Sequence, residues 1–189
     1  MRAELFSLFK ARAEMVSDEV HRVKDVQRAV EFIRNALSEI ASEQPGETEA
    51  LLLRGSLLEG VNPAELELPG AKVYDENFDR LAPGVMIGIS QLDLAIADTG
   101  TLCQDATDVK KRLVSTLPSV HIALVPTGGL VANLAEALEK FQGQVPGYLA
   151  FITGPSRTAD IERVLTIGVH GPERLIVLFI DEVGGGSLA

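Results

Sequence analysis

The sequence predicts an α/β protein whose sheet is parallel or mixed and is covered on both faces. Short, near-continuous apolar runs of strand length alternate with segments of helical periodicity, and turn signals separate the two. A strand buried on both faces has this pattern because neither of its sides meets water. The runs cover residues 85–89, 92–97, 120–125, 148–152 and 175–180.

The 189 residues are expected to form one domain preceded by an N-terminal helical segment. The segment spans residues 1–46 and repeats apolar residues at spacings of three and four, which is the helical pattern. We expect a single α/β domain at residues 47–183 and a flexible tail at residues 184–189. Residues 47–84 are rich in turn signals and are expected to hold one strand or short helix. The helical stripe consists of Val23, Val26, Val30, Ile33, Leu37 and Ile40.

Composition disfavours several classes of partner and cofactor. The formal net charge of −10 repels phosphate backbones and anionic lipid, so no nucleic-acid or membrane-surface partner is expected. No apolar run approaches the length of a membrane span, and the charged N-terminus does not resemble a secretory signal, so we expect a cytoplasmic protein. Cys103 is the only cysteine. The chain therefore cannot by itself supply the ligands of a cysteine-bound iron–sulfur cluster or zinc site.

The densest group of polar side chains lies in residues 153–172, which are predicted to form a strand–turn–helix–turn–strand unit. Thr158 is the expected N-cap of a helix over residues 159–167, with Asp160 in its first turn. Two hydroxyls, those of Ser156 and Thr158, and the Arg157 guanidinium would then surround a helix start, which suits a carboxylate or a phosphate. In the plainer alternative the hydroxyls and acids cap the helix, and Arg157 pairs with a carboxylate.

His170 lies in the turn that ends this unit. As a lone histidine in a turn, it is more often solvated than catalytic, and the three histidines of the chain show no metal-ligand spacing.

A second polar turn, Asp98, Thr99, Gly100 and Thr101, follows the apolar run at residues 92–97. At the carboxyl end of a parallel strand such a turn would lie in the crevice where ligands bind. The same residues also suit a hairpin whose next strand begins near Thr101. A helix is expected over residues 130–141, and its buried face is expected to consist of Val131, Leu134, Ala135 and Leu138.

Three segments of this chain together resemble the lactate-utilisation protein C family, the stand-alone LUD-domain proteins. They are ADTGTL at residues 97–102, RLVSTLPSVHIALV at 112–125 and GPSRTADIERVLTIGVHGP at 154–172. The resemblance covers about residues 85–182. It implies a three-layer α/β/α sandwich with a mostly parallel sheet, like that of the NagB/RpiA/CoA-transferase group. It also implies a part in bacterial oxidation of L-lactate to pyruvate, with the iron–sulfur clusters on partner proteins and no cofactor in this chain.

Three functions remain open at this stage, and the sequence assigns no catalytic residue. The first is a non-redox component of a lactate-oxidising system that binds a small carboxylate, anchored at Arg157, or a partner subunit that carries the clusters. The second is an autonomous enzyme for a phosphorylated or CoA-linked small molecule, with Asp98, Glu162 or His170 as candidate catalysts. The third is an assembly scaffold whose N-terminal helix forms a homo-oligomer.

Overall fold

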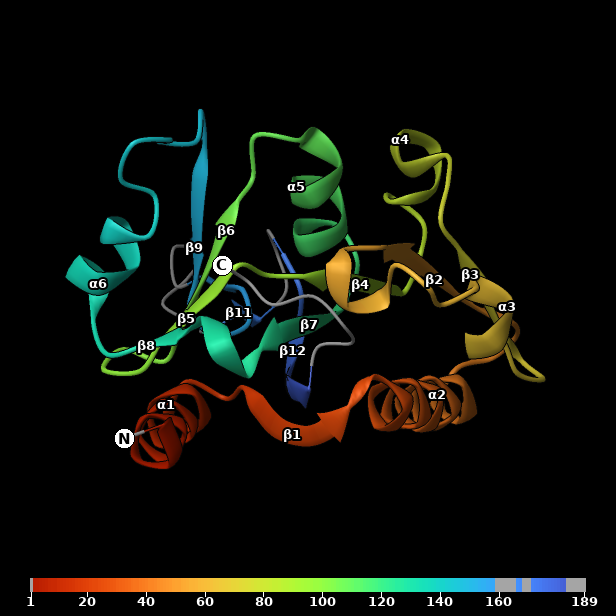
Figure 1. The fold of residues 1–189 in the computed structure, drawn as a ribbon. Helices are drawn as coiled ribbons and strands as arrows, with labels where there is room; N and C mark the ends of the chain where they lie inside the picture. Colours follow the sequence, from red (N-terminus) through yellow and green to blue (C-terminus); the bar gives the residue numbers. More distant parts are fainter. Residues whose placement is uncertain (1, 159–165, 168–170, 183–189) are drawn as a thin grey trace.

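The main sheet of the computed structural model has six strands, and each neighbouring pair is parallel (Figure 1). The structure describes residues 2–158, 166–167 and 171–182. The strand order in space is β1 (Glu19–Asp25), β12 (Arg174–Glu182), β7 (Val120–Pro126), β4 (Ile87–Gln91), β2 (Thr48–Leu53) and β3 (Ala71–Tyr74). The expected mostly parallel sheet is confirmed.

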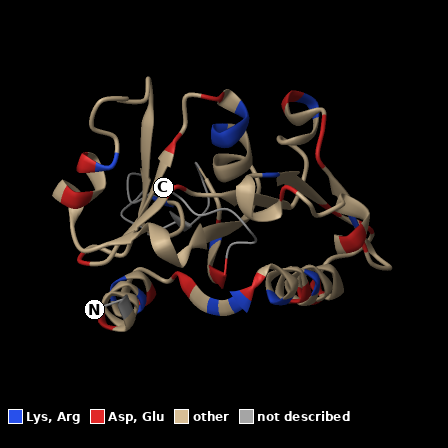
Figure 2. Cartoon of the chain, viewed as in Figure 1, with Lys and Arg blue, Asp and Glu red and all other residues tan. Residues whose placement is uncertain are grey.

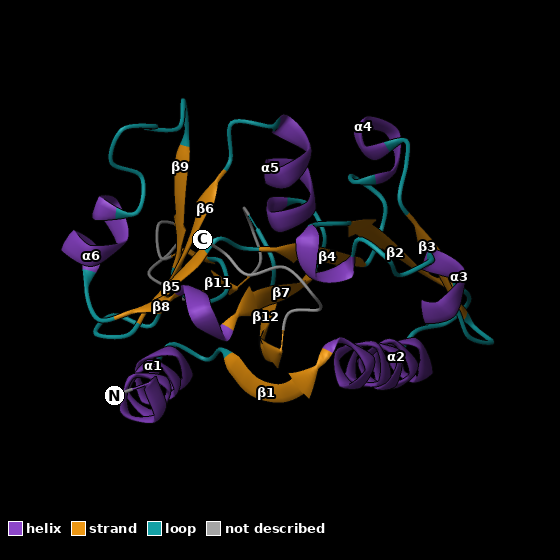
Figure 3. Ribbon diagram, viewed as in Figure 1, coloured by secondary structure: helices purple, strands orange, loops and turns teal. Residues whose placement is uncertain are grey.

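A second sheet of four short strands stands at one end of the main sheet (Figure 3). Its order is β8 (Leu130–Val131), β5 (Leu94–Ile96), β6 (Thr101–Asp105) and β9 (Leu149–Ile152). The β5–β6 and β6–β9 pairs are antiparallel, and the β5–β8 pair is parallel. A further two-stranded pair joins β10 (Arg157–Thr158) to β11 (Thr166–Ile167).

The main sheet is covered on both faces, as the sequence predicts. Successive side chains of a strand point to opposite faces, so β7 sends Ile122 and Leu124 to one side and Ala123 and Val125 to the other. The first side packs against α2 (Val26–Glu43), which lies below the sheet in Figure 1. The second side is covered by α1 (Arg2–Met15), the second sheet, α4 (Phe78–Leu81) and α5 (Val109–Thr116).

The shorter helical elements lie in the connections. They are the 3₁₀ turns η1 (Ser56–Leu58) and η2 (Thr127–Gly129), and the helices α3 (Pro63–Leu66) and α6 (Leu134–Glu139). No helix among the described residues is long and apolar enough to cross a membrane. Basic and acidic positions are interspersed along α1, β1 and α2 (Figure 2).

The expectation of an uninterrupted helical segment at the N-terminus is wrong for residues 19–25. These residues form β1, the edge strand that pairs with β12. Val23, assigned by the sequence to the helical stripe, lies on this strand. The stripe from Val26 onward is on α2, where Asp25 caps the helix by accepting a 2.9 Å hydrogen bond from the Arg28 amide.

Residues 47–84 hold more regular structure than the sequence suggests. Two strands of the main sheet, β2 and β3, come from this region, together with η1, α3 and α4. The expectation of one strand or short helix is therefore wrong. The elements are short enough that turn residues outnumber periodic ones, and the strands are revealed only by the pairing of β2 with β4 and of β3 with β2.

The helix expected over residues 130–141 begins later, at Leu134. Leu130 and Val131 form strand β8 instead. The predicted buried face is wrong for three of its four residues, because Ala135 is exposed and the Leu134 and Leu138 side chains are 48% and 47% exposed. Ala137 is the residue of α6 that is buried.

Candidate functional site

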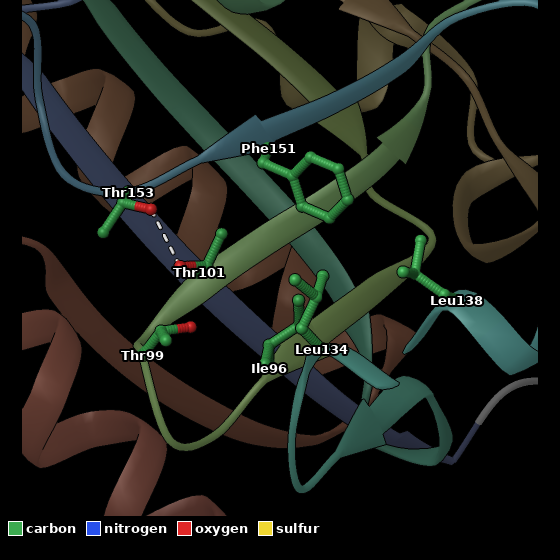
Figure 4. Close-up of a pocket in the computed structure, with 7 residues that line it drawn as sticks. All are labelled: Ile96, Thr99, Thr101, Leu134, Leu138, Phe151 and Thr153. Carbon is green, nitrogen blue, oxygen red and sulfur yellow. Dashed lines mark hydrogen bonds between the residues drawn. The ribbon is translucent and has the colours of Figure 1, made fainter. Parts of the chain in front are cut away.

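The second sheet carries a hollow on the face that turns away from the main sheet (Figure 4). Its volume is about 330 Å³. Strands β5, β6 and β9 contribute its floor and helix α6 one wall. The lining residues are Ile96, Thr99, Thr101, Leu134, Leu138, Phe151 and Thr153, so two of the predicted site residues, Thr99 and Thr101, lie in it.

One end of the hollow is polar and the rest is apolar. The hydroxyls of Thr101 and Thr153 are hydrogen-bonded at 2.8 Å, and Thr99 lies beside them in Figure 4. Thr101 is buried, whereas Thr99 and Thr153 are exposed. Sequence reasoning did not single out Thr153, although it opens the stretch that was predicted to hold the site.

The Asp98–Thr101 turn forms the hairpin that the sequence left as one alternative. Strands β5 and β6 are antiparallel, and the Gly100 amide donates to the Ile96 carbonyl at 3.0 Å. Gly100 has φ +68°, and a Cβ there would lie 2.5 Å from the Ala13 backbone nitrogen. Glycine thus permits both the left-handed turn and the close approach of α1. The Asp98 side chain is exposed at this turn.

Arg157 contacts the turn between α1 and β1. Its Nη2 donates to the Val16 carbonyl and to the Ser17 Oγ, at 2.7 Å in both cases. The guanidinium therefore ties the chain after β9 to the N-terminal part of the protein. Ser156 lies close by, and its amide donates to the Pro172 carbonyl at 2.8 Å.

Asp18 is an acidic residue of this turn that the sequence did not single out. Its side chain is 4% exposed. Burial raises the pKa of the Asp18 carboxyl to about 7, and the Gly154 amide and the Arg157 charge lower that pKa only in part. A carboxylate ligand at Arg157 would thus share the guanidinium with a buried acid. Nothing in the local sequence marks Asp18, because its burial comes from segments distant in the chain.

The helix predicted over residues 159–167 is wrong for its last two residues, Thr166 and Ile167, which form β11. Thr158, the expected N-cap, belongs to β10 and pairs with Thr166, while Arg157 pairs with Ile167. The rest of the predicted helix, residues 159–165, lies outside the described residues. The two predicted flanking strands are confirmed as β9 and β12, and they lie in different sheets, β9 in the second sheet and β12 in the main sheet. Asp160, Glu162 and His170 lie outside the described residues.

His121 is the most deeply buried histidine of those described. Its Nε2 lies 2.9 Å from the Ser90 Oγ, and burial lowers the pKa of the imidazole to about 4. Within the described parts of the chain, no three His, Cys, Asp or Glu side chains are grouped so that they could hold a metal ion.

A further group of polar residues lies at the carboxyl ends of β2 and β4. The chain leaves β2 toward β3 and leaves β4 toward β7, so these neighbours form a topological switch point, where α/β proteins commonly bind ligands. A hollow of about 560 Å³ there is lined by Arg54, Gly55, Ser56 and Glu59. A polar, glycine-containing turn after a short apolar run was the available sequence signal.

Gln91, the last residue of β4, holds this crevice in place by hydrogen bonds. Its Oε1 accepts a 2.9 Å hydrogen bond from the Leu57 amide, and its Nε2 donates to the Ser56 Oγ at 3.2 Å. A Cβ at Gly55 would lie 2.4 Å from the Gln91 Oε1, so glycine is needed for this arrangement. Arg54 pairs with Asp75 at 2.5 Å on the rim.

The family model of the LUD domain matches residues 6–180 of this chain. The chain belongs to the LUD domain family. The match includes both sheets and most of α1, so it covers the hollow, the Arg157 contacts and the switch-point crevice. The family resemblance expected from the three sequence segments is confirmed.

Curated relatives of this LUD domain carry the name lactate utilization protein C. The protein from Shouchella clausii is 37% identical over 101 residues, which is 51% of this chain and 44% of the relative. The protein from Macrococcus caseolyticus is 34% identical over 128 residues, which is 62% of this chain and 55% of the relative. The matched region thus spans about half the length of these relatives.

A solved structure shows the same fold. The crystal structure of a DUF162 family protein from Deinococcus radiodurans superposes with a TM-score of 0.65 and 21% identity. The comparison covers 95% of this LUD domain and 98% of that protein. Together with the mostly parallel sheet, it confirms the predicted α/β fold class.

Proposed function

We propose that this LUD domain takes part in L-lactate utilisation, in the oxidation of L-lactate to pyruvate, as a component that carries no redox cofactor of its own. The observation that carries the proposal is the likeness to relatives named lactate utilization protein C. The proposal includes a cytoplasmic location and partner proteins that hold the iron–sulfur clusters. The single cysteine supports that division, because a cluster needs several cysteine ligands.

Within this role, binding a cluster-bearing partner subunit is better supported than binding a small carboxylate at Arg157. The Nη2 of Arg157 already donates to Val16 and Ser17, and the buried Asp18 carboxyl lies beside it. A lactate carboxylate would have to compete for this guanidinium with groups of its own chain.

Deleting the gene from its source organism tests the proposal. We expect slower growth on L-lactate as sole carbon source and normal growth on pyruvate, because only the oxidation step is lost. Expression of the wild-type chain should restore growth. Unchanged lactate consumption by the deletion strain would contradict the proposed function.

Arg157→Ala separates the two binding modes. We expect a stability loss of about 1–2 kcal/mol, because two hydrogen bonds from a charged group disappear, and no change in titrations with lactate or pyruvate. Arg28→Ala, which removes an exposed 2.6 Å ion pair with Glu31, is the control for loss of an arginine. If calorimetry finds lactate binding that Arg157→Ala removes, the small carboxylate is the ligand and our preference for the partner is wrong.

The switch-point crevice favours a second candidate function, an autonomous enzyme for a phosphorylated or CoA-linked small molecule. The Arg54 guanidinium and the Ser56 hydroxyl could bind a phosphate there, although Glu59 and Asp75 oppose an anion. Turnover of a sugar phosphate or an acyl-CoA by the purified chain, lost in Ser56→Ala and retained in Ser42→Ala, would support it.

The scaffold reading, in which the N-terminal helix forms a homo-oligomer, gains no support from the packing of α1. Phe9 and Ala13 are fully buried within their own chain. Dimerisation through this side of α1 would first require its detachment. A homo-oligomer through another surface stays a prediction.

A further inference from the structure

Among the described residues, none that lines the hollow of the second sheet is charged. Strands β5, β8 and β9 consist of uncharged residues throughout, and they appear without red or blue in Figure 2. The nearest acids along the chain are Asp98, which precedes Thr99, and Glu139, which follows Leu138. A ligand carboxylate would leave water here without meeting a cation in the described lining, which is costly. The hollow therefore selects against anions, lactate and pyruvate included.

The polar end of the hollow offers hydrogen-bond donors. In the 2.8 Å contact between Thr101 and Thr153 one hydroxyl donates to the other, and the accepting hydroxyl keeps its own hydrogen. Neither hydroxyl has a second hydrogen bond to any described residue. Thr99 adds another hydroxyl at the same end. These groups suit a neutral oxygen acceptor, such as a carbonyl or a hydroxyl.

The rest of the hollow offers apolar surface that the protein leaves in water. Leu134, Leu138 and Phe151 are 48%, 47% and 46% exposed, and in Figure 4 they surround the space above Ile96. A bound apolar group would remove these side chains from water, at a gain of about 25 cal/mol for each Å². The volume of about 330 Å³ is at the lower end of the range for small-molecule sites.

We propose that this hollow binds a small uncharged molecule with an apolar body and one carbonyl or hydroxyl oxygen, the oxygen facing Thr101 and Thr153. The proposal goes beyond the role in lactate utilisation and does not depend on it, since the hollow excludes lactate itself. Concavity and the convergence of three hydroxyls on one end favour a small molecule over a flat protein contact.

Three probes of similar size test the proposal on the full chain: acetophenone, ethylbenzene and benzoate. Titrations are followed by the methyl resonances of Leu134, Leu138 and Thr153. We expect acetophenone to bind roughly three- to tenfold tighter than ethylbenzene, which is the effect of one neutral hydrogen bond, and benzoate to bind weakest.

Isosteric variants identify the polar end. The double variant Thr101→Val with Thr153→Val should bind acetophenone no better than ethylbenzene, while ethylbenzene binding stays unchanged. Thr116→Val, on the exposed side of α5, is the control and should change neither affinity. Equal binding of acetophenone by the double variant and the wild type would overturn the assignment of the two hydroxyls.

Leu138→Asp identifies the apolar wall, and Leu117→Asp is its matched control because both leucines are 47% exposed. We expect only Leu138→Asp to abolish binding of both neutral probes. Tightest binding of benzoate, or no response of the hollow methyls to any probe, would overturn the proposal. So would methyl shifts that depend on protein concentration and vanish in Leu138→Asp, because the hollow would then be an interface between copies.

Discussion

Asp18, in the turn after α1, makes the stability of the folded protein depend on pH. Its pKa is about 7 in the folded protein against 3.8 for an unperturbed aspartate, so the folded state keeps the proton to higher pH than the unfolded state does. The folded state is therefore most stable, as far as Asp18 is concerned, below about pH 4, where the carboxyl is neutral. Its free energy of unfolding then falls as the pH rises toward 7. Arg157 and Gly154 offset only part of the burial cost.

Asp18→Asn should remove this pH dependence, because asparagine is uncharged at every pH. In urea denaturation we expect the variant to be more stable than the wild type at pH 8, by on the order of 1–2 kcal/mol, and close to it at pH 4. Glu76→Gln, at an exposed position, is the control. An equal stability difference at both pH values would show that the carboxyl does not titrate in this window.

His121 has the opposite pH dependence. Burial lowers its pKa from 6.5 to about 4, so the unfolded state takes up a proton first as the pH falls. Stability that is full above about pH 6.5 is lost between 6.5 and 4.

In the Asp18→Asn background, the free energy of unfolding should still fall by roughly 2 kcal/mol between pH 7 and pH 4.5, because His121 becomes protonated in the unfolded state first. We expect the further substitution His121→Gln to remove this fall. Urea denaturation at a series of pH values measures it. His21→Gln is the comparison, because His21 is exposed whereas His121 is fully buried. If the free energy of unfolding of the His121 variant still falls by the full amount at acid pH, groups other than His121 cause that fall.

At the scale of elements, the β5–β6 hairpin and α1 fit together through Gly100. Any side chain there would have to occupy the left-handed region and would meet the Arg12 and Ala13 backbone at 2.5–2.9 Å. Backbone cannot move aside as the end of a flexible side chain can. The turn that holds Thr99 and Thr101 is thus positioned by the N-terminal helix.

Gly100→Ala should lower the free energy of unfolding by about 2 kcal/mol or more, from left-handed strain and the clash together. Gly128→Ala is the control, because a Cβ there meets no atom within 4 Å. Thermal melts of the two variants provide the comparison. Similar melting temperatures for both would mean that α1 does not approach the hairpin as closely as described.

Segments at opposite ends of the chain form one core at the scale of the whole molecule. The Phe9 ring meets the Phe179 ring edge-on at 5.1 Å between centroids, and both residues are fully buried. β1 and β12 likewise pair residues near the two ends of the chain. Folding of the sheet edge therefore requires the N-terminal segment.

Phe9→Ala should cost about 3–5 kcal/mol, the usual effect of emptying a buried aromatic position. Leu8→Ala, one residue earlier and 39% exposed, should cost much less. Urea denaturation compares them. A small effect of Phe9→Ala would indicate that α1 contributes little to the stability of the sheet.

The parts of the fold that could be predicted are those marked by a pattern in consecutive residues. The buried runs at residues 120–125 and 175–180 became β7 and β12 because they are apolar on both sides. β1 escaped prediction since an edge strand with Arg22 and Lys24 facing water lacks such a run. Helical spacing grouped Leu134 with Leu138 correctly, but it could not tell that no described element covers their face.

By itself the sequence determined the α/β class, the LUD family and two threonines of the hollow, because motifs and apolar runs are local in the chain. Tertiary structure alone decided that Arg157 holds the α1–β1 turn, that Asp18 is buried, and that Thr153 meets Thr101. The physical reason is that burial and hydrogen bonding depend on neighbours in space. Arg157 lies 141 residues from Val16 in the chain, and no local pattern encodes such a contact.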